Sequence, residues 1–329
     1  MDAKTLHETS IVIDGHCDTL LHLQAQERGQ GFPFGPPEEE PGQIDLERLR
    51  QGGVTAQNFA CYIRPQCLPA QATRETLRLI DVFYRFQSAH AGELCLATCA
   101  ADIERAKAEG QVAGLLSMEG AEGLEGDLGV LRMMHRLGVR WVGLTWSLRN
   151  QAGDGVAEVR TGGGLTCFGV DLVQELNRLG MIVDVAHLAP AGVRDVLEVS
   201  QAPVVASHAN ARALCDVSRN LTDEQLEGIA ATGGVVGVVY YPGFITAGQE
   251  PATLDMLLDH VDHIVRVAGI DHVGLGSDFD GFGGPPPVGL EDTSCVPHIT
   301  ERLLERGYDE TGVRRILGGN WLRVIGQVM

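Results

Sequence analysis

Short apolar segments that end in histidine or a carboxylate recur along this chain, and they constrain its fold more than any other feature. Five such segments cover residues 11–18, 112–120, 181–187, 203–208 and 272–278. Their ligand-type residues are His16, Asp18, Glu119, His187, His208 and Asp278. Short apolar runs are typical of buried parallel strands, and functional groups gather at the carboxyl ends of the strands in a (β/α)8 barrel. The pattern therefore predicts such a barrel, with the site at that end.

The rest of the chain fits the same architecture. The eight expected strands are residues 11–18, 54–63, 112–120, 139–146, 181–188, 203–209, 233–241 and 272–279. Residues 169–179 and 254–267 carry apolar side chains at helical spacing, and Thr222 followed by Gln225 matches a capping box. This alternation predicts one (β/α)8 TIM-like barrel domain over residues 1–329. Loops at 28–43, 150–164 and 281–290 are expected to lie over the ligand face.

Charge and composition argue against several classes of function. The formal net charge of −19 predicts repulsion from nucleic acid and from anionic membrane surfaces. No apolar run is long enough for a membrane span, and neither end of the sequence resembles a secretory signal or a lipid-anchor signal. The eight cysteines include no Cys-x-x-Cys pair and are expected to be reduced. We therefore expect a cytoplasmic enzyme with neither nucleic acid nor membrane as partner.

The residues at the strand ends favour metal binding. His16 and Asp18 are two positions apart, so an extended backbone points both side chains to the same face. An imidazole beside a carboxylate suits one divalent ion, and His187 with His208 suits a second. Cys17 points to the opposite face and is not expected to be a ligand. Taken together, the strand ends predict a binuclear site.

Two neighbouring metal ions usually share a bridging ligand. In many metal-dependent hydrolase barrels this ligand is a carbamylated lysine, but the only lysines here, Lys4 and Lys107, do not lie at strand ends. The bridge is therefore expected to be a carboxylate, and Glu119 is the one suitably placed.

Several motifs that include these residues occur in order along nearly the whole chain. They are Asp14-Gly15-His16-Cys17-Asp18, Ser117-Met118-Glu119-Gly120, His187, Ser207-His208, Ser218-Arg219-Asn220, Gly276-Ser277-Asp278-Phe279-Asp280-Gly281 and Gly318-Gly319-Asn320-Trp321-Leu322-Arg323. Together they resemble the membrane (renal) dipeptidase family of zinc metallopeptidases. The resemblance implies a barrel that binds two zinc ions and hydrolyses dipeptides, including those with a D-residue at the C-terminal position. The chain is most similar in character to a soluble bacterial member.

The resemblance also implies roles for individual residues. The metal ligands would be His16, Asp18, His187, His208 and the shared Glu119. Arg219 matches the arginine that holds the free carboxylate of the substrate, a task that suits a planar guanidinium. Asp278 matches an aspartate near the bridging water, so Asp278 and Glu119 are the expected catalytic residues. Asp280 is expected to orient its loop.

One position departs from the family pattern. Where the family commonly has a histidine at the end of the fourth strand, this chain has Trp146 in the sequence Leu144-Thr145-Trp146-Ser147. An indole N–H donates a hydrogen bond but carries neither a proton to transfer nor a positive charge. Either Trp146 donates to the substrate carbonyl, or Arg149 or Asn150 takes over, or the substrate differs. Trp146 and Asn150 are accordingly expected to be substrate-binding residues, and His135 is not expected to compensate.

The expected reaction is attack by a metal-bridging hydroxide on the peptide carbonyl, with Asp278 moving the proton to the leaving amine. The expected partners are a dipeptide or another small amide and, in a homodimer, a second copy of the chain. Two alternatives stay open at this point. One is another amide or N-acyl-amino-acid hydrolase on the same scaffold, and the other is a metal-binding barrel without catalysis.

Overall fold

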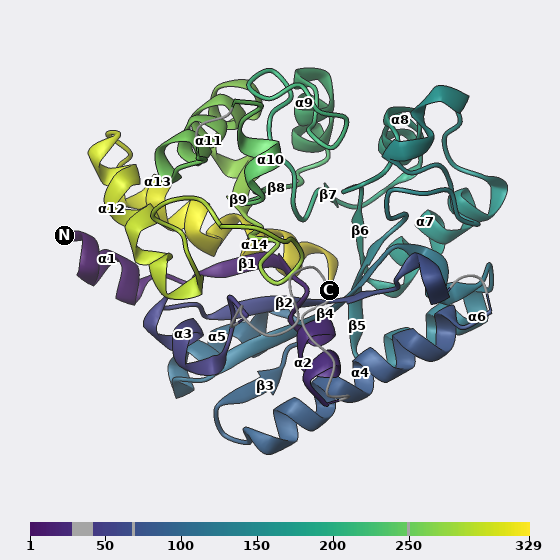
Figure 1. Ribbon diagram of the computed structural model, residues 1–329, viewed down its shortest axis with the longest axis horizontal. Coiled ribbons are helices and arrows are strands. Elements are labelled where there is room, and N and C mark those ends of the chain that lie inside the picture. The colour runs from purple at the N-terminus through teal and green to yellow at the C-terminus, as the bar shows by residue number, and fades with distance from the viewer. Residues whose placement is uncertain (28–41, 68–69, 249–250) are drawn as a thin grey trace.

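The computed structural model describes residues 1–27, 42–67, 70–248 and 251–329, and in it parallel strands form a barrel surrounded by helices (Figure 1). The strand order is β7-β6-β5-β4-β2-β1-β9-β8, and a parallel bridge between Ala206 and Val236 connects β7 with β8. This arrangement confirms the predicted (β/α)8 barrel. The strands of the ring are β1 (Ile13–Cys17), β2 (Ala56–Tyr62), β4 (Val112–Glu119), β5 (Val139–Gly143), β6 (Ile182–Asp184), β7 (Val204–Val205), β8 (Val236–Val238) and β9 (Val273–Leu275).

The strands differ from the prediction in two respects. An additional short strand, β3 (Leu94–Leu96), pairs with the start of β4 outside the ring, and its three residues were too few to show a pattern. Strands β5 to β9 end earlier than expected, because the chain turns at their carboxyl ends. His187 and Asp278 have φ values of 67° and 62°, in the left-handed region that ends a strand. The side chains beyond these strands are therefore positioned by turns.

Helices follow most strands and cover the outside of the barrel (Figure 1). The expected helix at 169–179 is α7, whose N-cap Thr166 accepts a hydrogen bond from the Gly169 N–H, and the capping box at Thr222 begins α9. The expected helix at 254–267 is α11. The helices are α1 (Ala3–Thr9), α2 (Thr19–Glu27), α3 (Leu46–Gln51), α4 (Ala72–Ala89), α5 (Ala100–Glu109), α6 (Leu128–Arg136), α7 (Cys167–Leu179), α8 (Pro190–Val199), α9 (Asp223–Ala231), α10 (Pro242–Ile245), α11 (Leu254–Ala268), α12 (Pro297–Glu305), α13 (Glu310–Arg314) and α14 (Asn320–Val328).

Two tryptophans fill the interior of the barrel below the site. The rings of Trp141 from β5 and Trp321 from α14 have centroids 5.0 Å apart, and both side chains are fully buried. The Trp321 indole N–H donates to the Leu275 carbonyl at 2.9 Å. A Cβ atom at Gly274 would lie only 2.5 Å from Trp321 Nε1, so a side chain at this position would displace the indole. Close packing here gives the strand ends above a rigid base.

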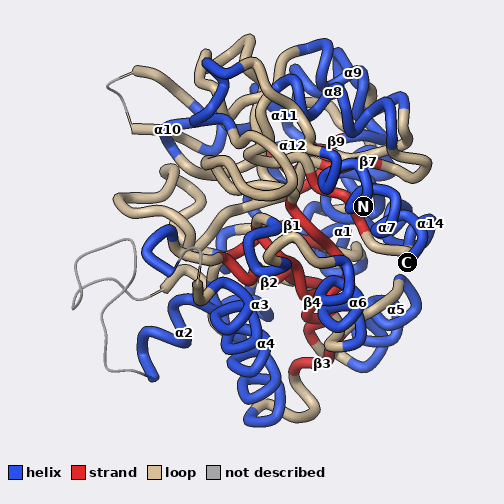
Figure 2. Tube along the Cα trace, turned by 90° about the vertical axis from the view of Figure 1, so that its right-hand side faces the viewer, coloured by secondary structure: helices blue, strands red, loops and turns tan. Residues whose placement is uncertain are grey.

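The long connecting loops gather on the side of the molecule opposite the two chain termini (Figure 2). Three loops were expected over the ligand face. Residues 28–41 of the first loop lie outside the described residues. Residues 281–283 of the third loop line the cavity described below. No helix in the described ranges has the length and apolar character needed to span a membrane.

Candidate metal centre

The carboxyl ends of β1 and β4 bring three of the predicted ligands together. His16 lies in β1, Asp18 directly follows it, and Glu119 is the last residue of β4. His16 Nε2 is 3.5 Å from Asp18 Oδ2 and 3.4 Å from Glu119 Oε2. All three side chains are almost completely buried. The expected pairing of His16 with Asp18 is therefore present, with Glu119 directly beside it.

The turns after β6 and β7 bring two more imidazoles to the other oxygen of Glu119. His187 Nε2 lies 3.0 Å from Glu119 Oε1, and His208 Nε2 lies 3.8 Å from the same atom. The two Nε2 atoms are themselves 3.0 Å apart. Each oxygen of Glu119 thus faces a different set of imidazoles, which is the arrangement that a carboxylate shared by two ions requires.

Asp278 also belongs to this cluster. Its Oδ1 lies 3.7 Å from His16 Nε2, and ligand atoms of His16, Asp18 and Asp278 all lie within 4.8 Å of one another. His16, Glu119 and His208 form a second group of this kind. The structure therefore brings together all six residues that the strand-end pattern singled out.

Two serines orient the imidazoles of the second pair. Ser147 Oγ is 3.0 Å from His187 Nδ1, and Ser207 Oγ is 2.8 Å from His208 Nδ1. Because each Nδ1 atom is engaged by a hydroxyl, each Nε2 atom points toward Glu119. Outer hydrogen bonds of this kind set the ring orientation and tautomer of histidine ligands in metal sites.

A buried carboxylate beneath the site joins β1 to the segment after β9. Asp14 accepts hydrogen bonds from the Ser277 N–H at 2.7 Å and from Gln57 Nε2 at 3.0 Å, and its Oδ2 also accepts from the Ser277 hydroxyl. These bonds hold the backbone of His16 close to that of Asp278. A direct hydrogen bond, from the Asp278 N–H to the His16 carbonyl at 3.1 Å, holds the same two segments together.

Asp184, the last residue of β6, is a second buried carboxylate that supports the site. Its Oδ1 accepts from the Ala186 N–H at 2.9 Å and the Ser207 N–H at 3.0 Å, while its Oδ2 accepts from the Trp141 indole at 3.1 Å. Asp184 thereby holds the turn that leads to His187 against the residue before His208. The sequence analysis identified neither Asp14 nor Asp184 as a supporting residue.

The electrostatics of the cluster favour binding of a cation. Burial, followed by the charge of Glu119, raises the pKa of Asp18 to about 6, and burial raises the pKa of Asp278 well above its usual range. Burial also disfavours ionised Glu119, but His16 and His187 outweigh it and hold the pKa of Glu119 low. Buried carboxylates this close together repel one another, and a bound cation would relieve that repulsion.

Unpaired atoms give the same indication. His16 Nε2 and Asp18 Oδ1 are buried and have no hydrogen-bond partner among the described residues. Leaving buried polar atoms without partners is costly unless another group occupies the space between them. Imidazole nitrogens and carboxylate oxygens are the donors that zinc and related divalent ions accept. The residues present therefore fit a metal centre.

A cavity of about 310 Å³ opens above the cluster. Arg219, from the segment between β7 and α9, lines it and is only 6% exposed. Its Nη2 donates to the His208 carbonyl at 3.0 Å, whereas its Nε has no hydrogen-bond partner in the described part of the chain. Burial lowers the pKa of Arg219 to about 10, so the guanidinium stays charged at neutral pH. A buried cation with a spare N–H in a cavity is suited to binding a carboxylate.

Comparison with known proteins identifies what this site belongs to. A family model described as membrane dipeptidase (peptidase family M19) matches residues 1–329. The chain belongs to this family. It is 37% identical over 339 residues to an uncharacterized dipeptidase of Schizosaccharomyces pombe, a match that covers 98% of this chain and 81% of the yeast protein. It is 36% identical over 327 residues to dipeptidase aclJ of Aspergillus oryzae, covering 96% of this chain and 77% of that protein.

The solved structures agree. A metallopeptidase from Rhodobacter sphaeroides, crystallised with a phosphinate mimic of the dipeptide L-Ala-D-Ala, superposes with a TM-score of 0.87 at 33% identity. The superposition covers 97% of this chain and 100% of that chain. The protein is a metallodipeptidase, a hydrolase that acts on peptide bonds.

Trp146, the position at which the dipeptidase departs from the family pattern, lies in the wall of the cavity. Its ring centroid is 5.4 Å from that of Tyr62 and 5.9 Å from that of His187. The indole therefore stands beside the proposed ligands, and its contact with substrate stays a prediction.

Arg149 and Asn150 do not take the place of the family histidine. Asn150 Nδ2 donates to the Leu144 carbonyl at 2.9 Å and Asn150 Oδ1 accepts from the Ala152 N–H at 2.7 Å, so both ends of the amide bond within the loop. The Arg149 guanidinium is largely exposed and pairs with Asp154. Neither residue lines the cavity. The expected contact between Asn150 and the substrate is therefore not supported by its position.

Asp280 supports the loop after β9 in the way the sequence suggested. Its carboxylate accepts from the Thr19 hydroxyl at 2.7 Å and from the Gln43 N–H at 2.5 Å, and it is completely buried. These bonds connect the segment after β9 to the start of α2 and to the segment before α3.

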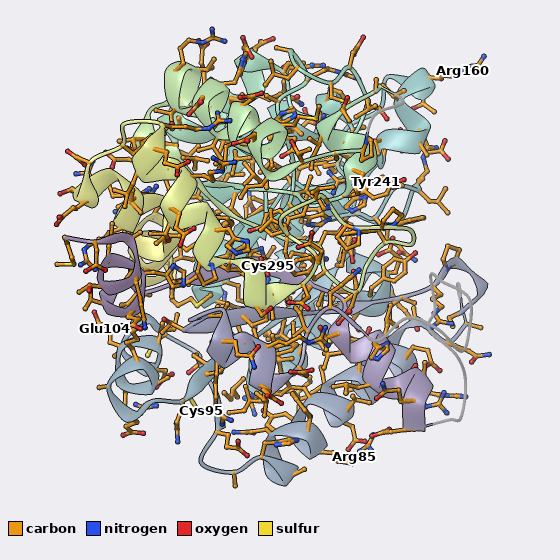
Figure 3. All side chains as sticks on the ribbon, turned by 60° about the vertical axis from the view of Figure 1, so that its left-hand side comes forward. Arg85, Cys95, Glu104, Arg160, Tyr241 and Cys295 are labelled. Carbon is orange, nitrogen blue, oxygen red and sulfur yellow. The ribbon has the colours of Figure 1, made fainter. Side chains whose placement is uncertain are left out.

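The sequence analysis missed most of the apolar wall of the cavity. Aromatic side chains from the end of β2 and from the segments that follow β8 and β9 contribute to it: Tyr62, Tyr241, Phe244 and Phe282. Tyr241 is labelled in Figure 3, on the side of the molecule opposite α1. The available signal was positional, because each of these residues lies at or just after the end of an expected strand.

Proposed function

We propose that this dipeptidase uses two zinc ions, bound by His16, Asp18, Glu119, His187 and His208. His16 and Asp18 would hold one ion, His187 and His208 the other, and Glu119 both. The observation that carries the proposal is the position of Glu119, whose two oxygens lie 3.4 Å from His16 Nε2 and 3.0 Å from His187 Nε2. Three imidazoles in the set favour zinc over magnesium or calcium, which prefer oxygen ligands.

The substrate is proposed to be a free dipeptide whose C-terminal carboxylate binds Arg219. The buried guanidinium lies in the same cavity as Glu119 and Asp278, so it fixes the distance from the carboxylate to the reacting bond. A peptide bond farther from the free carboxylate would not reach the reacting position, so this contact selects the bond next to the C-terminal residue. A D-residue at the C-terminal position is included in the proposal, since the Rhodobacter sphaeroides relative was crystallised with a mimic of L-Ala-D-Ala.

The proposed reaction is hydrolysis by hydroxide generated from water in the cavity. When bound, the two ions would lower the pKa of that water and polarise the scissile carbonyl. Asp278 lines the cavity and lies 3.7 Å from His16 Nε2, so it is placed to accept a proton from the water. It would then return the proton to the leaving amine as the C–N bond breaks, which restores the starting protonation state.

Metal analysis combined with a substrate panel tests this function. The panel contains free dipeptides with L or D residues at each position, their C-terminal amides and N-acetyl amino acids. Protein purified without chelator should contain close to two zinc ions per chain and should hydrolyse free dipeptides in preference to amides. Preferential hydrolysis of N-acetyl amino acids would instead indicate an N-acyl-amino-acid hydrolase. Two bound ions with no hydrolysis of any compound would indicate a barrel without catalysis.

A further inference from the structure

The aromatic side chains that line the cavity form two separate groups. Tyr62 and Trp146 contact each other, with ring centroids 5.4 Å apart. Tyr241 contacts Phe244 and Phe282, with centroid distances of 4.7 Å and 5.5 Å. Phe244 also lies beside Arg219, whose guanidinium carbon is 5.4 Å from the centre of the phenyl ring. The second group is therefore the one next to the proposed carboxylate anchor.

The strand order places Tyr62 across the barrel mouth from that anchor, and Trp146, which follows β5 two positions from β7, extends the wall from Tyr62. In the ring β7-β6-β5-β4-β2-β1-β9-β8, β2 stands four positions from β7 in either direction. Tyr62 is the last residue of β2, and Arg219 lies in the segment that follows β7. Figure 1 shows the same separation. The elements β8 and α10, near the second aromatic group, lie in its upper half, and β2 and α4 lie in its lower half. The proposed metal ligands lie between these two sides of the mouth.

We propose that Tyr62 and Trp146 form the subsite for the side chain of the N-terminal residue of the dipeptide, and that it selects aromatic and branched aliphatic side chains. The inference rests on the proposed function, because it takes Arg219 as the anchor of the C-terminal carboxylate. With the carboxylate there and the scissile bond above Glu119, the N-terminal residue extends toward the opposite wall. That wall consists of the phenol ring of Tyr62 and the indole of Trp146.

The chemistry of the wall determines which side chains it takes. Tyr62 is almost fully buried and Trp146 is half-buried, so the pair offers a large apolar surface next to His187. Five other lining residues carry a charge or an imidazole, and each already has a proposed role as metal ligand, proton carrier or carboxylate anchor. They are Asp18, Glu119, His187, Arg219 and Asp278. A charged N-terminal side chain would lose water against these two rings. An apolar side chain would gain from leaving water.

The test compares two dipeptide series in the zinc-loaded enzyme. One series varies the N-terminal residue (Gly, Leu, Phe or Glu before Ala), and the other varies the C-terminal residue in the same way. In the wild type, kcat/KM for Leu-Ala and Phe-Ala should exceed that for Gly-Ala by about 10- to 100-fold, with Glu-Ala lowest. Trp146→Ala should remove most of this preference while leaving the relative rates within the C-terminal series unchanged.

Phe244→Ala is the matched control, because it removes a ring from the other group. It should alter the C-terminal series and leave the ratio of Leu-Ala to Gly-Ala as in the wild type. Trp146→His, which introduces a smaller polar ring, serves if the alanine variant does not fold. Circular dichroism and zinc content establish that each variant is intact.

The outcomes separate the subsite from the function on which it rests. Loss of N-terminal preference in Trp146→Ala or Trp146→His, with that preference kept in Phe244→Ala, supports the subsite. An unchanged ratio of Leu-Ala to Gly-Ala in every intact Trp146 variant overturns the subsite alone. If zinc-loaded wild type hydrolyses no dipeptide at all, the proposed function fails and the subsite fails with it.

Discussion

Removing the guanidinium of Arg219 tests how the dipeptidase recognises the carboxyl end of its substrate. In the structure, Nη2 is bonded to the His208 carbonyl at 3.0 Å, and the buried Nε has no partner among the described residues. Nε is thus free to donate to a substrate carboxylate. Because the guanidinium is already buried in the free protein, its desolvation is not an additional cost of binding.

The expected size of the effect follows from the type of contact. Hydrogen bonds between charged partners contribute about 1.5–3 kcal/mol, so Arg219→Ala should lower kcat/KM for free dipeptides by about 10- to 150-fold. The contact to the carboxylate is present both before and during reaction, so most of the loss should appear as a higher KM. Dipeptide amides should lose much less, because they have no carboxylate.

Steady-state kinetics with paired free and amidated dipeptides measures this effect. Arg212→Ala is a suitable control, since Arg212 precedes Arg219 in the same segment but pairs with the exposed Asp216 at 3.1 Å. That variant should behave as the wild type. Arg219→Lys keeps the charge but loses the planar fork, so it should recover only part of the affinity. Equal losses for free and amidated dipeptides in Arg219→Ala would refute the assignment of Arg219 as carboxylate anchor.

Three further predictions concern the metal centre. Elemental analysis of protein purified without chelator should find close to two divalent ions per chain, and a value of one or less with full activity would contradict a binuclear site. Glu119→Gln should lose affinity for both ions, because a neutral amide bridges two cations poorly. Its activity should fall by several orders of magnitude while its circular dichroism spectrum stays unchanged. Retention of both ions would show that another residue forms the bridge. Ser207→Ala should weaken metal binding by about 10- to 100-fold in a chelator competition, since His208 loses the hydroxyl that orients its ring, whereas an unchanged affinity would show that packing alone orients it.

The sequence determined the architecture and predicted which residues would gather at the candidate site, because both depend on local patterns. Apolar runs alternating with amphipathic segments predict the (β/α)8 barrel, and parallel strands in a closed ring necessarily bring their carboxyl ends to one face. His16, Glu119 and His208 could therefore be predicted to converge although they are far apart in the chain. The family resemblance added Arg219, whose place in the cavity no local pattern reveals.

The turns at the strand ends were not predictable in the same way. The expected strand through residue 188 ends at Asp184, because the Asp184 carboxylate bonds to the N–H groups of Ala186 and Ser207 and the chain turns there. This choice depends on Ser207, which follows the next strand, β7, and lies outside any short window around Asp184. The left-handed conformation of His187 follows from the same turn.

Only the tertiary structure decided which neighbouring side chains face the cavity. Trp146 and Asn150 are four positions apart in one loop, yet Trp146 lines the cavity and Asn150 bonds to the Leu144 carbonyl. Likewise, Tyr62 and Tyr241 come from distant strands and meet the same cavity only because the ring of strands closes. Secondary structure and strand-end chemistry follow from interactions close in sequence, whereas the shape of the cavity follows from contacts between segments that only the closed barrel brings together.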